Sequence, residues 1–147
     1  MVSAGIDVEV GGADGRTALM NASGGAHAPV VERLLAAGAS VQARSNAGRD
    51  ALEYALMPDW AGLFRPTGTS ELTRTVAKLV ARGAVVSDQH LLWAVITHVP
   101  AVVEALVRRP LSASRVSRVI ALAKTTPHEW AVDDAVFDVN CAALRRG

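Results

Sequence analysis

The sequence has 147 residues, of which 50% are apolar, so it suits one domain with a substantial core. Its net charge of +1 does not by itself indicate nucleic-acid binding. Its apolar stretches fall far short of the roughly 20 residues of a membrane-spanning helix, and its N-terminus lacks the basic and apolar regions of a secretory signal. The single cysteine, Cys141, excludes an internal disulfide and a zinc site built from several cysteines, so we expect a soluble, cytoplasmic protein without metal or cofactor.

The N-terminal half of the chain repeats itself. Two segments recur at an offset of 33 residues, namely Gly5–Val10 as Gly38–Ala43 and Gly15–Leu19 as Gly48–Leu52. Residues 34–41 match residues 79–86 at an offset of 45, which implies about twelve inserted residues in the second unit. A repeated supersecondary unit explains these matches.

Each unit predicts two helices followed by a projecting hairpin. Thr17 is suited to cap a first short helix, and residues 30–35 place apolar side chains at helical spacing in a second. Gly38 is suited to the left-handed conformation beyond a helix end. The polar stretch 41–48 then predicts a turn at the tip of a short hairpin, which we call a finger.

These residues resemble the ankyrin repeat family. Asp14–Met20 is similar to the family's Gly-x-Thr-Pro-Leu-His opening, residues 26–31 are similar to its Gly-His-x-x-Val-Val segment, and Gly38–Val41 is similar to its Gly-Ala-Asp-Val. The resemblance is clear over residues 5–56 and 72–86 and divergent after residue 87. It implies an all-α solenoid of stacked helix pairs with short hairpin fingers, and it implies that His27 is a structural histidine.

The sequence departs from the family pattern at several positions. Ala18 and Met20 replace the usual Pro and His, Ala26 replaces a Gly, and Asp50 replaces the second Thr. These replacements leave helix formation intact, because Asp also caps helices well.

We expect one domain over residues 1–147. Its parts are a partial-repeat tail (3–11), repeat 1 (12–44), repeat 2 (45–86) with an insertion at 57–71, a degenerate repeat 3 without a finger (87–110), and a divergent C-terminal capping repeat (111–147). Ser87 or Asp88 is suited to cap the first helix of repeat 3. The last helix is expected from Pro127, where Thr126 and Glu129 form a capping box.

The implied function is a non-catalytic protein–protein interaction scaffold of the adaptor or inhibitor type. The candidate contact residues in the fingers and adjoining turns, at positions that the family commonly varies, are Ala13, Asp14, Arg16, Arg44, Asn46, Ala47 and Arg49. Because three of them are Arg, a partner with an acidic surface patch is expected. The alternative is that these arginines only solvate the fingers.

Two further surfaces are candidates for contact. Trp60 and Phe64 in the insertion either anchor a partner or fold back over the helices. The first helix pair has no obvious N-terminal cap. Either the chain is part of a longer array, or Val30, Leu34 and their neighbours are covered by a partner or by a second copy.

Other functions are less well supported by the residues. A nucleic-acid-binding module would use the basic cluster Arg108–Arg118, which has no acidic residue within it, but stacking aromatics are missing beside it. An enzyme or small-molecule binder would need a pocket under the 57–71 loop. His90 and His98 are about two helical turns apart, too far to share one metal ion.

Overall fold

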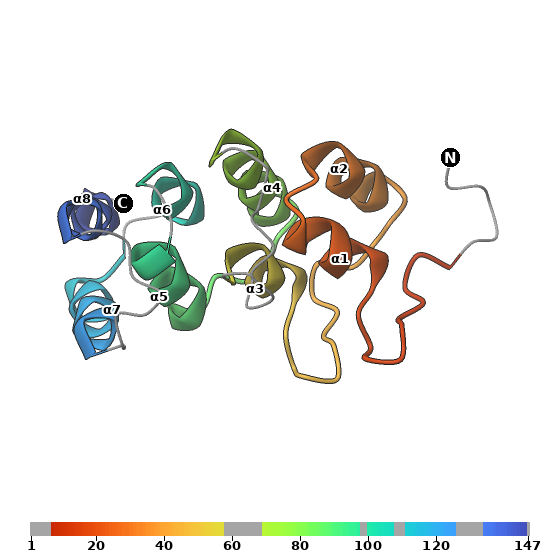
Figure 1. Cartoon of the computed structure of the whole chain (residues 1–147), viewed down its shortest axis with the longest axis horizontal. Coiled ribbons are helices and arrows are strands. Elements are labelled where there is room, and N and C mark those ends of the chain that lie inside the picture. The colour runs from red at the N-terminus through yellow and green to blue at the C-terminus, as the bar shows by residue number, and fades with distance from the viewer. Residues whose placement is uncertain (1–6, 58–68, 98–99, 108–110, 126–133, 147) are drawn as a thin grey trace.

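The computed structural model describes residues 7–57, 69–97, 100–107, 111–125 and 134–146 (Figure 1). The described residues form eight helices and no strand. In chain order they are α1 (Ala18–Gly24), α2 (Ala28–Ala36), α3 (Ala51–Leu56), α4 (Thr69–Ala81), α5 (Asp88–Thr97), α6 (Pro100–Leu106), α7 (Ala113–Thr125) and α8 (Asp134–Arg146).

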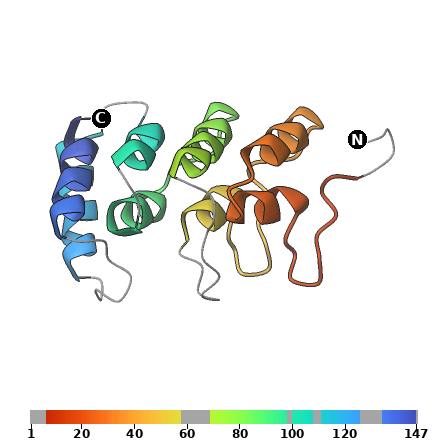
Figure 2. The same cartoon turned by 45° about the horizontal axis from the view of Figure 1, so that its top comes forward.

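The helices are stacked in two rows. Helices α1, α3, α5 and α7 follow one another in the first row, and α2, α4, α6 and α8 lie in the same order in the second (Figures 1 and 2). Each row contains one helix from each of four successive pairs. The expectation of an all-α stack of helix pairs is therefore confirmed.

The first helix of every pair begins with the same kind of cap. A side-chain oxygen of the residue before the helix accepts a hydrogen bond from the backbone N–H three residues later. The capping residues are Thr17 for α1, Asp50 for α3, Ser87 for α5 and Ser112 for α7. Such caps satisfy a backbone donor that the helix itself leaves unpaired. The capping roles expected of Thr17 and Asp50 are confirmed, and Ser87 is the cap that precedes α5.

The core is built from Leu and small side chains. The fully buried leucines are spread over several helix pairs and comprise Leu19, Leu52, Leu56, Leu79, Leu91 and Leu144. Each contributes about 2 kcal/mol of burial free energy. Buried alanines such as Ala22, Ala51 and Ala55 lie in α1 and α3, where their small size lets neighbouring helices approach closely.

Three residues with positive φ lie at the ends of helices in the second row. Gly38 and Gly83 follow α2 and α4 with φ of +93° and +91°, the left-handed conformation that glycine adopts without strain. Ala26, which replaces the family's Gly before α2, also has a positive φ, +53°. Its methyl group is fully buried, so packing holds a conformation that alanine otherwise avoids.

We expect Gly83→Ala to lower the free energy of unfolding by about 1–2 kcal/mol, because a Cβ at φ +91° is strained although nothing lies within 4 Å of it. Gly24→Ala is the matched control. Gly24 ends α1, and a Cβ there would make only an ordinary contact at 3.7 Å. The control should leave stability unchanged or raise it by about 0.5 kcal/mol. Urea unfolding measures both, and equal effects of the two substitutions would contradict the assignment.

The structure changes one expectation about the insertion, and two other expectations concern residues outside the described ranges. The last residues of the expected insertion, 69–71, form the first turn of α4, because Thr69 already begins that helix. Trp60 and Phe64 lie outside the described residues. The described part of the last helix starts at Asp134, so Thr126, Pro127 and Glu129 are outside it as well.

Residues 7–10 make contacts at the N-terminal end of the helix stack, where no N-terminal cap was expected. Leu34 is buried. Val8 packs against the core, and the Glu9 carboxylate accepts a hydrogen bond of 2.7 Å from the Ser40 backbone N–H. Val30 and Val10 are 48% and 68% exposed and are the apolar side chains left open at this end of the described chain.

Candidate protein interaction surface

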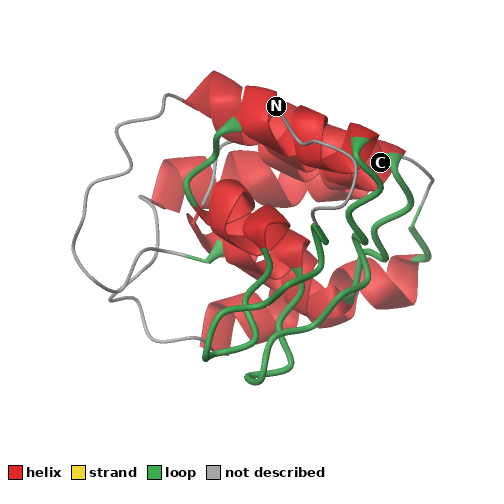
Figure 3. Cartoon of the chain, turned by 90° about the vertical axis from the view of Figure 1, so that its right-hand side faces the viewer, coloured by secondary structure: helices red, strands yellow, loops and turns green. Residues whose placement is uncertain are grey.

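Two fingers project from the side of the stack that carries the first row of helices (Figures 1 and 3). We define the first finger as residues 11–16 and the second as residues 44–49. Both have the same two backbone hydrogen bonds, from Gly12 to Arg16 (3.0 Å) and Gly15 to Gly12 (2.8 Å), and from Ser45 to Arg49 (2.9 Å) and Gly48 to Ser45 (2.8 Å). Their turn glycines have nearly equal φ angles, +72° and +74°. The offset of 33 residues thus reproduces one turn geometry twice.

Asn46 joins the two fingers to each other. Its backbone N–H donates to the Asp14 carbonyl at 3.0 Å, and its side-chain Nδ2 donates to the Ala13 carbonyl at 3.2 Å. The two bonds hold the fingers side by side. Asn46 was expected to face a partner, and the structure gives its amide this role within the chain.

Arg16 connects the first finger to helix α3. Its Nε lies 3.0 Å from the Asp14 carboxylate, and its guanidinium lies 4.5 Å from the centre of the Tyr54 ring, where the cation is attracted to the aromatic face. The Tyr54 hydroxyl donates in turn to Ser45 Oγ at 3.0 Å. Tyr54 therefore links both fingers to the helix below them.

The other two finger arginines also face acidic groups of this chain. Arg44 Nη1 donates to the Gly48 carbonyl at 2.6 Å and its Nη2 lies 4.0 Å from the Asp50 carboxylate. Arg49 Nε lies 3.8 Å from the Glu53 carboxylate. The charges expected to attract an acidic partner are thus partly offset within the molecule. Arg44 is the most open of the three, since its side chain is 62% exposed.

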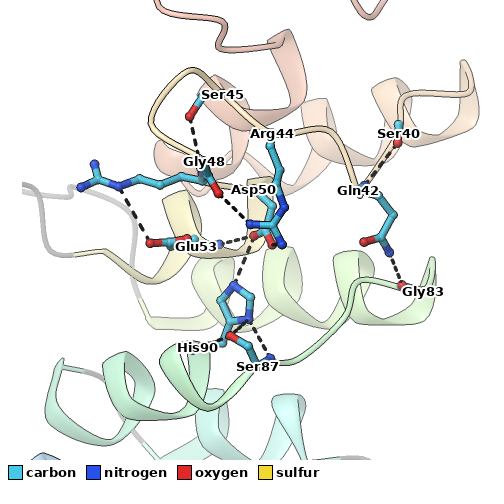
Figure 4. Close-up of polar contacts among 11 residues, drawn as sticks. Ser40, Gln42, Arg44, Ser45, Gly48, Asp50, Glu53, Gly83, Ser87 and His90 are labelled. Carbon is cyan, nitrogen blue, oxygen red and sulfur yellow. Dashed lines mark hydrogen bonds and ion pairs between the residues drawn. The ribbon is translucent and has the colours of Figure 1, made fainter.

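Beneath the fingers, a buried polar network joins the second and third helix pairs (Figure 4). The His90 ring is 4% exposed, and its Nε2 lies 3.2 Å from the Asp50 Oδ1 atom. Its Nδ1 accepts a hydrogen bond of 3.0 Å from the Ser87 backbone N–H. Because Nδ1 is an acceptor, the proton of the neutral ring lies on Nε2 and is donated to Asp50.

The Asp50 carboxylate serves three groups at once. Burial raises its pKa, but the hydrogen bonds from His90 and from the Glu53 backbone N–H, with the charge of Arg44, outweigh burial and lower the pKa below its usual range. Asp50 therefore stays ionised, caps α3 and fixes the position of α5 through His90. The resemblance to the ankyrin family pointed instead to His27, which is exposed and makes no side-chain capping bond at the start of α2.

The charge of the described part of the expected basic cluster is partly offset by an acid from another helix. Arg115 Nε and Arg118 Nη2 lie 2.6 Å and 2.9 Å from the two oxygens of Asp88, and Arg115 also donates to the Val86 carbonyl at 2.8 Å. The hydrogen bond from Arg115 and the charges of both arginines keep the pKa of the Asp88 carboxyl below its usual range. Arg108 and Arg109 lie outside the described residues.

Asp88→Asn is expected to make the chain elute from heparin at higher salt, because it removes the acid that neutralises Arg115 and Arg118. The cost in stability should stay below about 1 kcal/mol, since these side chains are solvent-accessible. Because the folded-state pKa of Asp88 is lowered, its contribution is present above the ordinary carboxyl pKa and disappears as the pH falls through the lowered value. Unchanged elution from heparin would show that the two arginines are not available to an anionic ligand even without Asp88.

The described residues offer little for catalysis or metal binding. Cys141 is buried, and burial together with the charge of Asp138 raises the pKa of its thiol despite the opposing charges of Arg145 and Lys124. Such a thiol is a poor nucleophile. No group of three His, Cys, Asp or Glu side chains within the described ranges could hold a metal ion. Among the described helices, none is both long and apolar enough to cross a membrane.

The comparison with known proteins agrees with this architecture. Residues 14–46 match the family model described as ankyrin repeat, and this range covers part of the first finger, helices α1 and α2, and part of the second finger. The resemblance inferred from the sequence is therefore confirmed, and the fold is an ankyrin-type helical repeat. Ankyrin repeats are generally protein–protein interaction modules and are typically not enzymes. No curated protein and no solved structure matches the chain.

Proposed function

We propose that this protein is a non-catalytic protein–protein interaction scaffold, of the adaptor or inhibitor type, that contacts its partner through the two fingers. The observation that carries the proposal is the pair of hydrogen bonds from Asn46 to Asp14 and Ala13, which fix the fingers against each other. A surface that is ordered before binding loses less conformational entropy when a partner docks. The fingers are therefore suited to recognition by shape.

The residues available to a partner are fewer than the finger residues first expected. Ala13 and Ala47 lie at the turn tips and are exposed, whereas the polar side chains between them are engaged in holding the fingers together. Arg44 is the remaining exposed charge on the second finger, and we assign to it the preference for an acidic patch on the partner. Trp60 and Phe64 are proposed as a second anchor on the insertion.

The proposal is tested by affinity capture with a double fingertip variant, Ala13→Arg with Ala47→Arg. Both positions are exposed, so the long side chains obstruct a docked partner without disturbing the core. The matched control is Ala36→Arg with Ala101→Arg, which places the same charges on exposed positions of α2 and α6. Proteins captured from the source extract by the unmodified chain and the control should be reduced about tenfold or more with the fingertip variant.

The contrary outcomes are equally clear. If the fingertip variant and the control capture the same proteins in equal amounts, the fingers are not the contact surface. If both variants lose the captured proteins, the second row of helices takes part in binding, and the fingers alone do not define the interface.

A further inference from the structure

The second finger has an open row of hydrogen-bond acceptors. At the offset of 33 residues, Asn46 and Ala47 take the places that Ala13 and Asp14 have in the first finger. The carbonyls of Ala13 and Asp14 both accept hydrogen bonds, from the Asn46 side chain and backbone. The carbonyls of Asn46 and Ala47 accept none within the described chain, and both residues are exposed.

These acceptors are open because no third finger follows. After Gly83, residues 84–86 lead directly to the cap Ser87 and helix α5. At the corresponding place after Gly38, residues 39–49 precede the cap Asp50 and include the second finger. Residues that flank the second finger contact the segment that follows α4 and helix α5: Gln42 Nε2 donates to the Gly83 carbonyl at 2.8 Å, and His90 contacts Asp50 (Figure 4). Among the described residues, no hydrogen bond reaches the Asn46 or Ala47 carbonyl from this side.

We propose that the Asn46 and Ala47 carbonyls form a docking edge for a β-turn of a partner protein that carries an asparagine. The partner's asparagine would donate its backbone N–H to the Ala47 carbonyl and its side-chain amide to the Asn46 carbonyl. This pairing repeats the contact that Asn46 makes with the first finger, so the partner's turn stacks as a third finger. The inference rests on the proposed function, because it names the partner chemistry of the same surface.

The arrangement selects its donor by chemistry and by reach. Two backbone carbonyls can pair only with donors, so an aspartate in the partner's turn would repel them and an alanine would leave one acceptor unpaired. The Asn46 side chain reaches the Ala13 carbonyl while its own N–H bonds Asp14, which shows that one asparagine fits both acceptors. The edge therefore distinguishes asparagine from aspartate and from alanine.

The test uses a probe taken from this chain, a cyclic peptide with the sequence of residues 43–50, which contains Asn46. It is titrated to about 5 mM, the range for a single weak contact, into the isotope-labelled full chain. The carbonyl carbons of Asn46 and Ala47 and the amide of Gly48 should shift. Peptides with Asn46→Ala and Asn46→Asp are the matched controls and should bind at least about fivefold more weakly.

Three results would overturn the inference. They are an absence of shifts with the asparagine peptide, equal affinities for the three peptides, and shifts confined to the outer side of the first finger at residues 11–13. Each leaves the proposed function untouched if the fingertip variant still loses its captured proteins. Conversely, peptide binding at Asn46 and Ala47 combined with unchanged capture would support the edge and contradict the role of the fingers in partner binding.

Discussion

Asp50→Ala lowers the free energy of unfolding by about 3–4 kcal/mol, the largest loss that we expect from a single polar substitution in this chain. The carboxylate of Asp50 caps α3 by accepting the Glu53 N–H at 2.8 Å, and it accepts the Nε2 proton of His90 at 3.2 Å. Its removal costs about 1 kcal/mol for the cap. It also leaves the buried His90 donor unpaired, which costs about 2 kcal/mol more.

Urea unfolding at pH 7 measures the loss, and two controls separate its causes. Asp14→Ala removes an exposed carboxylate from the first finger and should change stability by less than about 0.5 kcal/mol. Asp50→Asn keeps an oxygen to cap α3 and should cost about half as much as Asp50→Ala. If Asp50→Ala and Asp14→Ala have similar effects, the junction between the second and third helix pairs does not depend on the buried carboxylate.

The same junction predicts a dependence on pH. Because the folded-state pKa of Asp50 is lowered, its ionised form contributes stability that is complete above the ordinary carboxyl pKa and is lost as the pH falls through the lowered value. The difference in stability between the unmodified chain and Asp50→Ala should therefore shrink below about pH 4. A difference that grows with acidity would contradict the assignment of Asp50 as an ionised group in the fold.

Local features of the fold were predictable from the sequence because neighbouring residues determine them. Thr17 and Asp50 precede apolar residues at helical spacing, and Gly38 follows a helix, so their caps and turn could be inferred without knowledge of distant contacts. The same reasoning limited the capping residue of α5 to Ser87 or Asp88, and the structure selects Ser87. Ser112, which caps α7 in the divergent C-terminal repeat, has the same spacing to its helix, but the sequence around it does not match the other repeats and so did not identify it as a cap.

The roles of the surface residues were harder to predict, because they depend on contacts between repeats. Asn46 was expected to bind a partner, yet the offset of 33 residues already placed it beside Ala13, and that signal could have revealed the contact. His90 lies three residues after its capping residue Ser87, the position that Met20 and Glu53 have after Thr17 and Asp50. This spacing places His90 beside its cap, but its contact with Asp50 joins different repeats. The basic cluster had no acid within its own segment, but Asp88 begins the neighbouring helix α5 and pairs with two of its arginines.

Gly15→Ala should lower the free energy of unfolding by about 2–3 kcal/mol and separate the two fingers. Gly15 has a φ of +72°, which alone costs alanine about 1–2 kcal/mol. A Cβ at this position would also lie 2.9 Å from the Asn46 backbone nitrogen and 2.5 Å from its side-chain oxygen. The second finger must move away to relieve this contact, which weakens the bonds from Asn46 to Asp14 and Ala13.

Gly48→Ala is the matched control, because Gly48 is the corresponding residue of the second finger. Its φ is +74°, but nothing lies within 4 Å of a Cβ placed there. It should therefore cost only the conformational term, about 1–2 kcal/mol, and leave the fingers joined. Hydrogen exchange of the Asn46 amide distinguishes the two variants, since only Gly15→Ala should accelerate it. Equal exchange in both would mean that the fingers are not held together by Asn46, and the preordered surface on which the proposed function rests would lose its physical basis.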